Sequence, residues 1–371
     1  MQMLWLKTGV LKYTKVNEFL DEFNIGINDL VFTHEFIYNL ILPQYNLKTN
    51  VLFLEKFGIG EPSNIIIDKI FSEVKSKNYN RVIAIGGGSV IDIAKILALE
   101  ITGKTIDMFE KKIALVKKCE LIIVPTTCGT GSEVTNLSIV EIVEKKTKMG
   151  LSSDEMFADY AILIPGLLKS LPYDFFIYSS IDALIHAAES YVSPNSNEYT
   201  ELFSISSIKK ILKGYAAIVK NGKDFRFEML EEFLVASNFA GIAFGNTGVG
   251  AVHALSYPLG GNYHVPHGEA NYQFFTEIFK VYKKKKPQGK IKILAAIIAE
   301  TLDIAAENAF EKIDDLLTRL IVKKKLHQYG MKEHEIAEFT DSVIKNQQRL
   351  LKNNYVELKA KEIEEIYKSL Y

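Results

Sequence analysis

The segment Arg81–Lys95, RVIAIGGGSVIDIAK, constrains the fold of this chain more than any other stretch. Its first part, Val82–Ile85, is a short apolar run of the kind that forms a strand buried in a parallel sheet. Three glycines follow, and Val90–Leu99 then has the spacing of a helix that packs on a sheet. A strand, a glycine turn and a helix in this order predict a βαβ unit of a Rossmann-like parallel sheet.

The glycine turn also predicts a binding site for a pyrophosphate group. Backbone N–H groups at the start of a helix attract phosphate, and glycine lets the phosphate approach because it has no Cβ. A tight structural turn would use the same residues, and the run is not the G-x-G-x-x-G fingerprint. We predict that five residues of this turn and helix contact the cofactor: Gly86, Gly87, Gly88, Ser89 and Asp92.

A second loop has the same form. Leu121–Val124 is typical of another buried strand, and it runs into PTTCGTGSE, residues 125–133. Hydroxyl groups and backbone amides in such a loop can together hold phosphate, ribose or a nicotinamide carboxamide. The alternative is a polar connection in which Ser132 caps a helix. Two such loops in one sheet favour nucleotide binding, and the predicted contacts from this loop are Thr126, Thr127, Thr130 and Ser132.

The pattern of apolar residues changes along the chain. Short strands alternate with helices in the first part, which is typical of an α/β fold, and long helical patterns dominate after about Leu167. Because Pro165 and Gly166 punctuate the change, we predict an α/β dinucleotide-binding domain over residues 1–165. An all-helical domain that binds metal and substrate is predicted over residues 166–371. The predicted strands are Leu30–Thr33, Asn50–Phe53, Val82–Ile85 and Leu121–Val124, and the predicted helices include Pro62–Asn78, Val90–Leu99, Phe175–Val192, Tyr199–Val219, Phe225–Phe244 and Ala296–Leu320.

One carboxylate and three imidazoles in the second part predict a metal site. Asp182 and His186 are four residues apart, so on a helix they project from one face. His253 and His267 come from a glycine-rich stretch and from a loop fixed by Pro266. Such a set suits a divalent first-row metal such as Fe²⁺ or Zn²⁺, with positions left open for substrate. Each residue alone is more often an ordinary polar side chain, but the set gains weight because a nucleotide-binding half precedes it.

Composition excludes several classes of function. The net charge of −1 gives no general attraction to nucleic acid or to an anionic membrane. The N-terminal stretch Met1–Lys7 is too short for the apolar part of a signal peptide, and no apolar run reaches membrane-spanning length. Two cysteines, Cys119 and Cys128, offer no disulfide framework. We therefore expect a cytoplasmic enzyme that acts on a small molecule.

Four stretches resemble the iron-dependent (group III) alcohol dehydrogenases in order and spacing: GGGSVIDIAK, PTTCGTGSEVTN, DALIHAAESYVS and the segment from His253 to His267. Within that family the chain is similar to 4-hydroxybutyrate dehydrogenases, through the stretches Gly58–Ser63, Phe239–Asn246 and Val252–Asn271. The resemblance implies a dehydroquinate synthase-like architecture, in which a Rossmann-like sheet precedes a helical metal-binding domain. We also expect a homodimer or higher homo-oligomer.

The resemblance implies a reaction as well. Hydride would pass from a metal-bound alkoxide to the nicotinamide of NAD, and the substrate pair would be 4-hydroxybutyrate and succinate semialdehyde. Fe²⁺ is the implied metal, with Zn²⁺ as the alternative. Three other functions stay open: a dehydrogenase of 1,3-propanediol or another short-chain alcohol, a dehydroquinate synthase-like lyase, and an assembly module such as those found in filaments.

Two departures from the family pattern concern the catalytic end of the site. Tyr257 stands where many relatives have a histidine with a proton-relay role, and His264 is a second candidate for that role. We predict that His264 relays the proton, because an imidazole titrates near physiological pH, and that Tyr257 shapes the substrate pocket. Asn353–Tyr355 stands where relatives often have Asn-Pro-Arg, so no role is carried over to it.

A third departure concerns the choice of cofactor. His34 follows the predicted strand Leu30–Thr33, where relatives often have an aspartate. An acid there binds the adenosine ribose and repels a 2′-phosphate. We predict that His34 contacts the ribose, and NADP stays open beside NAD.

Overall fold

The computed structural model describes residues 2–58, 60, 62–145 and 147–371. Two residues of the stretch Gly58–Ser63, Ile59 and Glu61, lie outside the described residues. The chain divides into two compact units, one formed by Leu6–Ser170 and the other by the residues up to Trp5 together with Leu171–Tyr371.

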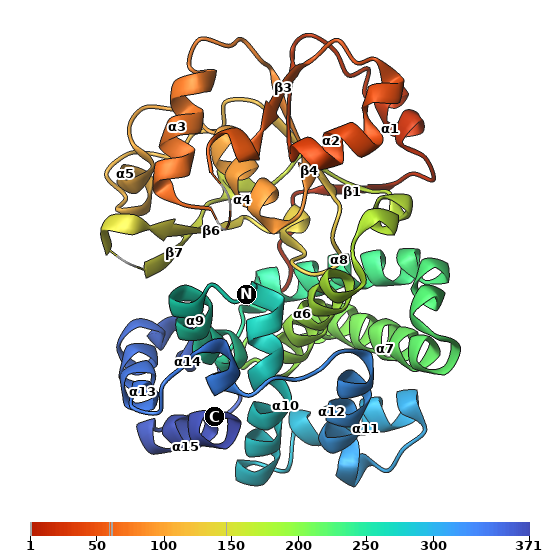
Figure 1. The fold of residues 1–371 in the computed structure, drawn as a ribbon, viewed down its shortest axis with the longest axis vertical. Coiled ribbons are helices and arrows are strands. Elements are labelled where there is room, and N and C mark those ends of the chain that lie inside the picture. The colour runs from red at the N-terminus through yellow and green to blue at the C-terminus, as the bar shows by residue number, and fades with distance from the viewer. Residues whose placement is uncertain (1, 59, 61, 146) are drawn as a thin grey trace. The chain divides into compact units, whose positions relative to one another are not determined.

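The first unit is built on a six-stranded sheet whose neighbouring strands are all parallel, in the order β1-β8-β5-β4-β2-β3. Each of the four predicted strands forms, with at most one further residue at either end. This result confirms the Rossmann-like parallel sheet expected from the sequence (Figure 1). The strands are β1 (Gly9–Lys12), β2 (Asp29–Thr33), β3 (Asn50–Phe53), β4 (Arg81–Gly86), β5 (Glu120–Pro125) and β8 (Tyr160–Leu163).

Helices cover both faces of this sheet because successive strand residues point to opposite sides. In β2, Leu30 and Phe32 belong to one buried core, and Val31 belongs to the other. The first core includes apolar residues of α3 (Asn64–Val74), α4 (Gly88–Leu97) and α5 (Thr105–Phe109), and the second includes those of α1 (Val16–Glu22) and α2 (Glu35–Ile41). A strand buried on both faces explains the continuous apolar runs in the sequence.

An antiparallel hairpin of β6 (Leu137–Ile142) and β7 (Thr147–Ser152) follows the second glycine-containing loop. The sequence did not predict this hairpin, nor strands β1 and β8. The latter two have four residues each, and β1 enters the sheet only by pairing with β8, about 150 residues later in the chain.

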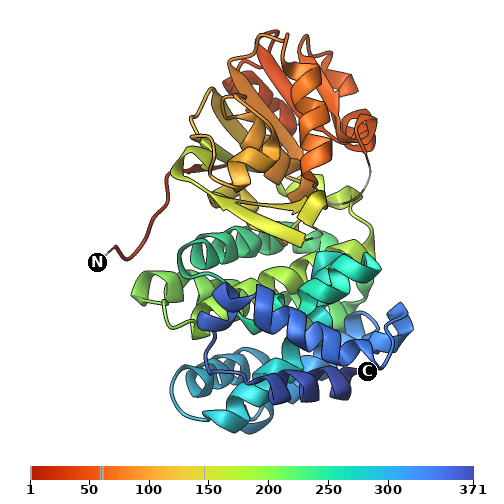
Figure 2. The ribbon, with the colours of Figure 1, turned by 90° about the vertical axis from the view of Figure 1, so that its left-hand side faces the viewer.

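The second unit consists of helices, and Figure 2 shows no strand among its described residues. The helices are α6 (Tyr173–Val192), α7 (Glu198–Asn221), α8 (Leu230–Thr247), α9 (Ala251–Tyr263), α10 (His267–Lys285), α11 (Lys290–Leu302), α12 (Ala309–Leu320), α13 (Glu335–Asn346), α14 (Gln348–Lys352) and α15 (Ala360–Leu370). The predicted helical half is therefore confirmed.

Two helix predictions were wrong in detail. The single helix predicted over Ala296–Leu320 is two helices, because Asp303 adopts the left-handed conformation with φ 54° and ends α11. The helix predicted over Phe225–Phe244 begins as a 3₁₀ turn over Lys223–Glu228, and α8 starts only at Leu230. In both places a short non-α segment interrupts an apolar pattern that continues past it: Asp303–Asn308 in the first, and the 3₁₀ turn with Met229 in the second. None of the helices that the structure describes is long and apolar enough to cross a membrane.

Candidate metal and cofactor sites

Helix α6 presents two of the predicted metal ligands from one face. Asp182 and His186 lie one turn apart on it, and both are buried. The helix is apolar along most of its surface, so these polar side chains face the interior of the helical unit. Buried polar groups need partners, and the other predicted ligands supply them.

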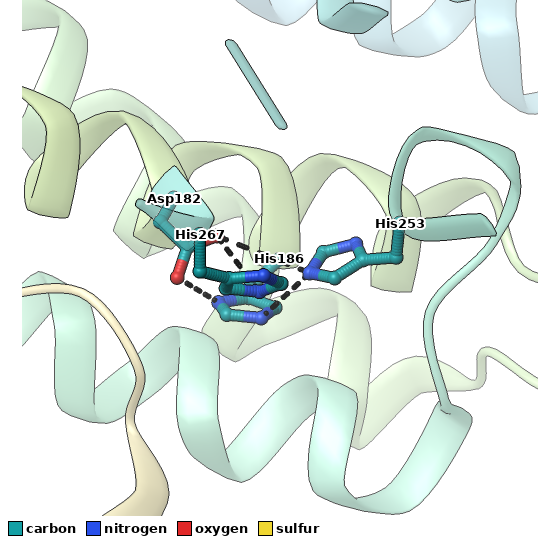
Figure 3. Close-up of side chains that lie close together, drawn as sticks. All are labelled: Asp182, His186, His253 and His267. Carbon is teal, nitrogen blue, oxygen red and sulfur yellow. Dashed lines mark hydrogen bonds and ion pairs between the residues drawn. The ribbon is translucent and has the colours of Figure 1, made fainter. Parts of the chain in front are cut away.

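The structure brings all four predicted ligands together, from α6, α9 and the first residue of α10 (Figure 3). Asp182 Oδ1 lies 3.9 Å from His253 Nε2 and 3.7 Å from His267 Nε2. Asp182 Oδ2 lies 3.8 Å from His186 Nδ1. The two imidazole nitrogens His186 Nε2 and His253 Nε2 are 3.0 Å apart. One ligand atom from each residue lies within 4.8 Å of the ligand atoms of the other three.

A buried carboxylate fixes the orientation of His253. Glu189, one turn beyond His186 on α6, lies with Oε2 2.6 Å from His253 Nδ1. Its Oε1 accepts a hydrogen bond of 2.7 Å from the backbone N–H of Val252. A carboxylate on Nδ1 holds the proton there and leaves the Nε2 lone pair free for a metal.

Asn271 and Phe244 hold the remaining ligands. Asn271 Nδ2 donates to Asp182 Oδ1 over 2.8 Å and lies 3.1 Å from His267 Nε2. The ring of Phe244 stacks on His186 with centroids 4.2 Å apart. These contacts already restrict the rotation of the side chains, so metal binding costs less conformational entropy.

Gly268 lets α10 approach α6 at the site. A Cβ on this residue would lie only 2.4 Å from the carbonyl oxygen of Tyr178. Real Cβ atoms do not approach backbone oxygen so closely, so a larger residue would push His267 away from Asp182.

Electrostatics favour the charged form of Asp182. Burial raises the pKa of this carboxyl group, but the imidazoles of His186, His267 and His253 and the hydrogen bond from Asn271 outweigh burial. The pKa of Asp182 therefore lies below its usual range, and the carboxylate is ready to bind a cation.

These residues fit a divalent metal. Two nitrogens that each bind tetrahedral Zn²⁺ at about 2.1 Å lie about 3.4 Å apart, and the separations above fall around that value. Three imidazole nitrogens and one carboxylate oxygen are ligands that Fe²⁺ and Zn²⁺ both accept. A second buried carboxylate behind one imidazole is a common support for such ligands.

The two candidates for proton relay lie in different surroundings. The ring of Tyr257, on α9 one turn after His253, is half-buried with its centroid 6.2 Å from that of His267. His264 is exposed and ends α9 in the left-handed conformation, with φ 53°. The relay role stays a prediction for both residues.

The two predicted cofactor loops meet at the carboxyl ends of β4 and β5. These strands are neighbours, with Gly86 opposite Pro125, and Thr126 N–H donates to Gly86 O over 3.0 Å. A Cβ on Gly87 would lie 3.1 Å from Thr127 Cγ2, and one on Gly88 would lie 2.9 Å from Thr130 Cγ2. Glycines therefore allow the loops to pack together, at the strand ends where ligands bind in such sheets.

Asp92 and Ser132 bond to each other rather than standing apart. Ser132 Oγ donates to Asp92 Oδ1 over 2.7 Å, and the buried Lys95 donates to Ser132 Oγ over 2.6 Å. Lys95 Nζ also donates to Thr135 Oγ1 and to Leu137 O, over 3.0 and 2.7 Å. These bonds tie the second loop to α4. Ser89 lies half-buried in the first turn of that helix.

His34 forms a pair that the sequence did not suggest. It lies at the end of β2, and its Nδ1 is 2.8 Å from Oε1 of Glu55, which follows β3. Three other residues that support the sites were also missed: Glu189, Asn271 and Lys95. Glu189 and Asn271 do carry a signal, since they lie seven residues after Asp182 and four after His267, each on the ligand face of its helix.

Comparison with known proteins gives relatives of the whole chain. It is 54% identical over 371 residues to the 4-hydroxybutyrate dehydrogenase of Clostridium kluyveri, and the match covers 100% of both chains. It is 31% identical to long-chain-alcohol dehydrogenase 1 of Geobacillus thermodenitrificans, over 84% of this chain and 80% of that protein.

Solved structures share its fold. A 1,3-propanediol oxidoreductase has a TM-score of 0.86 at 22% identity, with 100% of both chains covered. A sulfoacetaldehyde reductase from Bifidobacterium kashiwanohense, in complex with NAD⁺, has a TM-score of 0.86 at 22% identity, over 100% of this chain and 99% of that one. At 22% identity this similarity establishes the fold alone.

Two family models together match most of the chain. The model described as "Iron-containing alcohol dehydrogenase" matches residues 9–165, and the one described as "Fe-containing alcohol dehydrogenase family, C-terminal" matches residues 176–371. The first covers the sheet with its two glycine-containing loops, and the second covers the helices that carry the four clustered ligands. With the full-length relative, these matches confirm the resemblance found in the sequence: the chain belongs to the iron-containing alcohol dehydrogenase family.

Proposed function

We propose that this protein is a metal-dependent, NAD-linked dehydrogenase that interconverts 4-hydroxybutyrate and succinate semialdehyde. The observation that carries the proposal is the 54% identity to a 4-hydroxybutyrate dehydrogenase over the whole length of both chains. Support also comes from the ligand cluster, because oxidation of an alcohol by NAD in this way needs a Lewis acid beside the substrate.

We assign the two parts of the reaction to the two parts of the chain. Residues 1–165 bind the dinucleotide, and residues 166–371 bind the metal and the substrate. Asp182, His186, His253 and His267 hold the metal, Fe²⁺ in the first instance with Zn²⁺ as the alternative. When bound, the metal supplies Lewis acidity, which lowers the pKa of a substrate hydroxyl group or polarises an aldehyde carbonyl.

The remaining roles belong to side chains of this protein. Glu189 keeps the proton of His253 on Nδ1, and Asn271 orients Asp182. Of the two candidates, we assign the proton-relay role to Tyr257. Its ring centroid lies 6.2 Å from that of His267, whereas His264 is exposed at a helix end. A positioned hydroxyl group can pass the substrate proton on before hydride leaves.

The cofactor contacts are assigned to the two loops. Gly86, Gly87, Gly88 and Ser89 would contact the pyrophosphate, with Thr126, Thr127 and Thr130 of the second loop. Asp92 and Ser132 would act from behind these contacts, through the bonds that join the loop to α4. We further propose a homodimer or higher oligomer, and a cytoplasmic location, since the buried Cys119 and Cys128 form no disulfide among the described residues.

A substrate panel tests the proposal. The Fe²⁺-loaded protein is assayed for reduction of NAD⁺ and NADP⁺ with 4-hydroxybutyrate, 1,3-propanediol, ethanol and lactaldehyde. We expect the highest kcat/KM for 4-hydroxybutyrate with NAD⁺. A higher kcat/KM for 1,3-propanediol would replace the assigned substrate. Turnover of a substrate without net change in NADH absorbance would point instead to a dehydroquinate synthase-like lyase.

A further inference from the structure

A histidine and a glutamate form a pair at the carboxyl ends of strands β2 and β3. His34 Nδ1 lies 2.8 Å from Glu55 Oε1, and the other oxygen of Glu55 accepts a hydrogen bond of 3.1 Å from the backbone N–H of Glu35. The His34 ring also stacks on Phe36, with centroids 5.2 Å apart. A backbone N–H on Glu55 and the Phe36 ring on His34 hold the pair, yet the side chains of His34 and Glu55 remain 26% and 32% exposed, so a ligand can reach them.

This pair lies beside the first glycine-containing loop in the sheet. Strand β2 pairs with β4, with Thr33 opposite Ile85, so His34 follows β2 at the level where Gly86 ends β4. In dinucleotide-binding sheets, the strand next to the glycine-loop strand ends in an acid that binds the 2′-hydroxyl of the adenosine ribose. Here that strand ends in His34, and the carboxylate comes from the next strand over, β3.

We propose that Glu55 is the residue that makes this protein select NAD over NADP, both by its charge and by orienting His34. The inference rests on the proposed function, since it concerns the dinucleotide assigned to this sheet. In the tautomer whose Nδ1 donates to Glu55, Nε2 of the His34 imidazole is a hydrogen-bond acceptor. A ribose 2′-hydroxyl can donate to Nε2, whereas a 2′-phosphate brings only further acceptors and negative charge.

The charges around the pair act in the same direction. The Glu55 side chain contacts His34, whereas the Glu35 side chain, at the start of α2, is exposed. The neighbouring cation, Lys56, forms an ion pair of 2.9 Å with Glu73 of α3. A 2′-phosphate would therefore meet the Glu55 carboxylate at close range, where like charges repel strongly.

Binding of NADH and NADPH tests this inference without any assay of turnover. The dissociation constants of both nucleotides are measured by calorimetry for the wild-type protein, for Glu55→Gln and for His34→Ala. Glu55→Gln keeps the size of the side chain and an oxygen that can accept from His34, but removes the charge. We expect it to tighten NADPH binding by about tenfold and to change NADH binding by less than about threefold. His34→Ala should weaken NADH binding by about tenfold.

Glu35→Gln is the matched control, because Glu35 is an exposed carboxylate on the same segment and bonds Glu55 through its backbone N–H, which the substitution keeps. An NADH/NADPH ratio that is unchanged in a folded Glu55→Gln protein would overturn the inference. So would an equal change in Glu35→Gln, because net charge and not the pair would then set the preference. A wild-type protein that binds neither nucleotide would refute the proposed function itself and this inference with it.

Discussion

Glu189 is a buried residue that connects the four clustered residues to the start of α9. It accepts the Nδ1 proton of His253, and it also binds the backbone N–H of Val252 at the start of α9. Its side chain is almost completely buried, so its charge is offset by these partners rather than by water.

Replacement of Glu189 by glutamine should weaken metal binding while leaving the four ligands in place. The neutral amide no longer favours the Nδ1 proton of His253, so the Nε2 lone pair is less available. We expect an affinity for Fe²⁺ or Zn²⁺ lower by about 10- to 100-fold, measured by competition with a chelator. Glu198→Gln, an exposed residue on α7, is the control. Equal metal affinity in the Glu189→Gln and wild-type proteins would show that Glu189 does not support metal binding.

Tyr257 and His264 are distinguished by paired variants. If Tyr257 passes the proton on, Tyr257→Phe should lower kcat by roughly 10²-fold with the metal content unchanged, and His264→Ala should have a small effect. Steady-state kinetics and elemental analysis of both variants provide the measurement. The opposite pattern, in which only His264→Ala lowers kcat, would assign the relay to the exposed histidine and leave Tyr257 as a wall of the pocket.

At the scale of residues, the sequence predicted what depends on residue type and local spacing. Asp182 and His186 were found because their four-residue interval places them on one helix face. Glu189, Asn271 and Glu55 were missed because their contacts join elements that are far apart along the chain. A glutamate three residues after a histidine is otherwise an ordinary helix residue, and only the position of α9 gives it a role.

At the scale of elements, the two loops at the ends of β4 and β5 form one packed unit. Gly88 is the tightest point between them, where a Cβ would lie 2.9 Å from Thr130 Cγ2. Gly88→Val should displace the second loop and raise the dissociation constant for NADH by on the order of tenfold or more, in a titration by fluorescence. Gly166→Val is the matched control, since nothing lies within 4 Å of a Cβ there. Unchanged affinity for NADH in a folded Gly88→Val protein would show that the cofactor phosphates do not bind at this loop.

Lys95 joins the same loop to α4, and its burial has a consequence for stability. Burial lowers the pKa of Lys95 to about 8, more than Asp92 and Glu133 raise it. The unfolded chain holds this proton up to about pH 10.5, so between pH 8 and 10.5 the unfolded state binds more protons. Stability contributed by this residue therefore rises with pH in that window.

The comparison of wild-type protein with Lys95→Met isolates this effect. The difference in free energy of unfolding should grow in favour of the wild type by about 1 kcal/mol per pH unit above pH 8, as measured by urea denaturation. Lower stability of the variant at every pH is also expected, because Ser132 and Thr135 lose a buried donor. A difference that stays constant from pH 8 to 10 would contradict the account of Lys95.

Elements were predicted well where the pattern was long or the residues were strongly apolar. The four buried strands and the helices α6 and α7 agree with their predicted ranges to within a few residues. The break after Leu302 was not predicted, because the short segment Asp303–Asn308 leaves an apolar pattern on either side of it. Strand β1 joins the sheet by pairing with β8, and β8 by pairing with β5, contacts between distant parts of the chain that a local pattern does not reveal.

At the scale of the whole molecule, the family models match residues 9–165 and 176–371, most of the chain. The sheet unit and the helical unit each match a family model, and solved structures at 22% identity keep the fold with TM-scores of 0.86. A 1,3-propanediol oxidoreductase and a sulfoacetaldehyde reductase share this fold, so the fold alone does not identify the substrate. The choice of 4-hydroxybutyrate rests instead on the 54% identity that extends over all 371 residues.

The most direct test of the central proposal is oxidation of 4-hydroxybutyrate by NAD⁺ in protein prepared with and without its metal. We expect NADH formation in the Fe²⁺-loaded protein, its loss after treatment with a chelator, and its return when Fe²⁺ is restored. The His186→Ala variant, which lacks one ligand, should stay inactive under the same restoration. Full turnover of 4-hydroxybutyrate in the metal-free protein, or in His186→Ala, would contradict the proposed metal-dependent function.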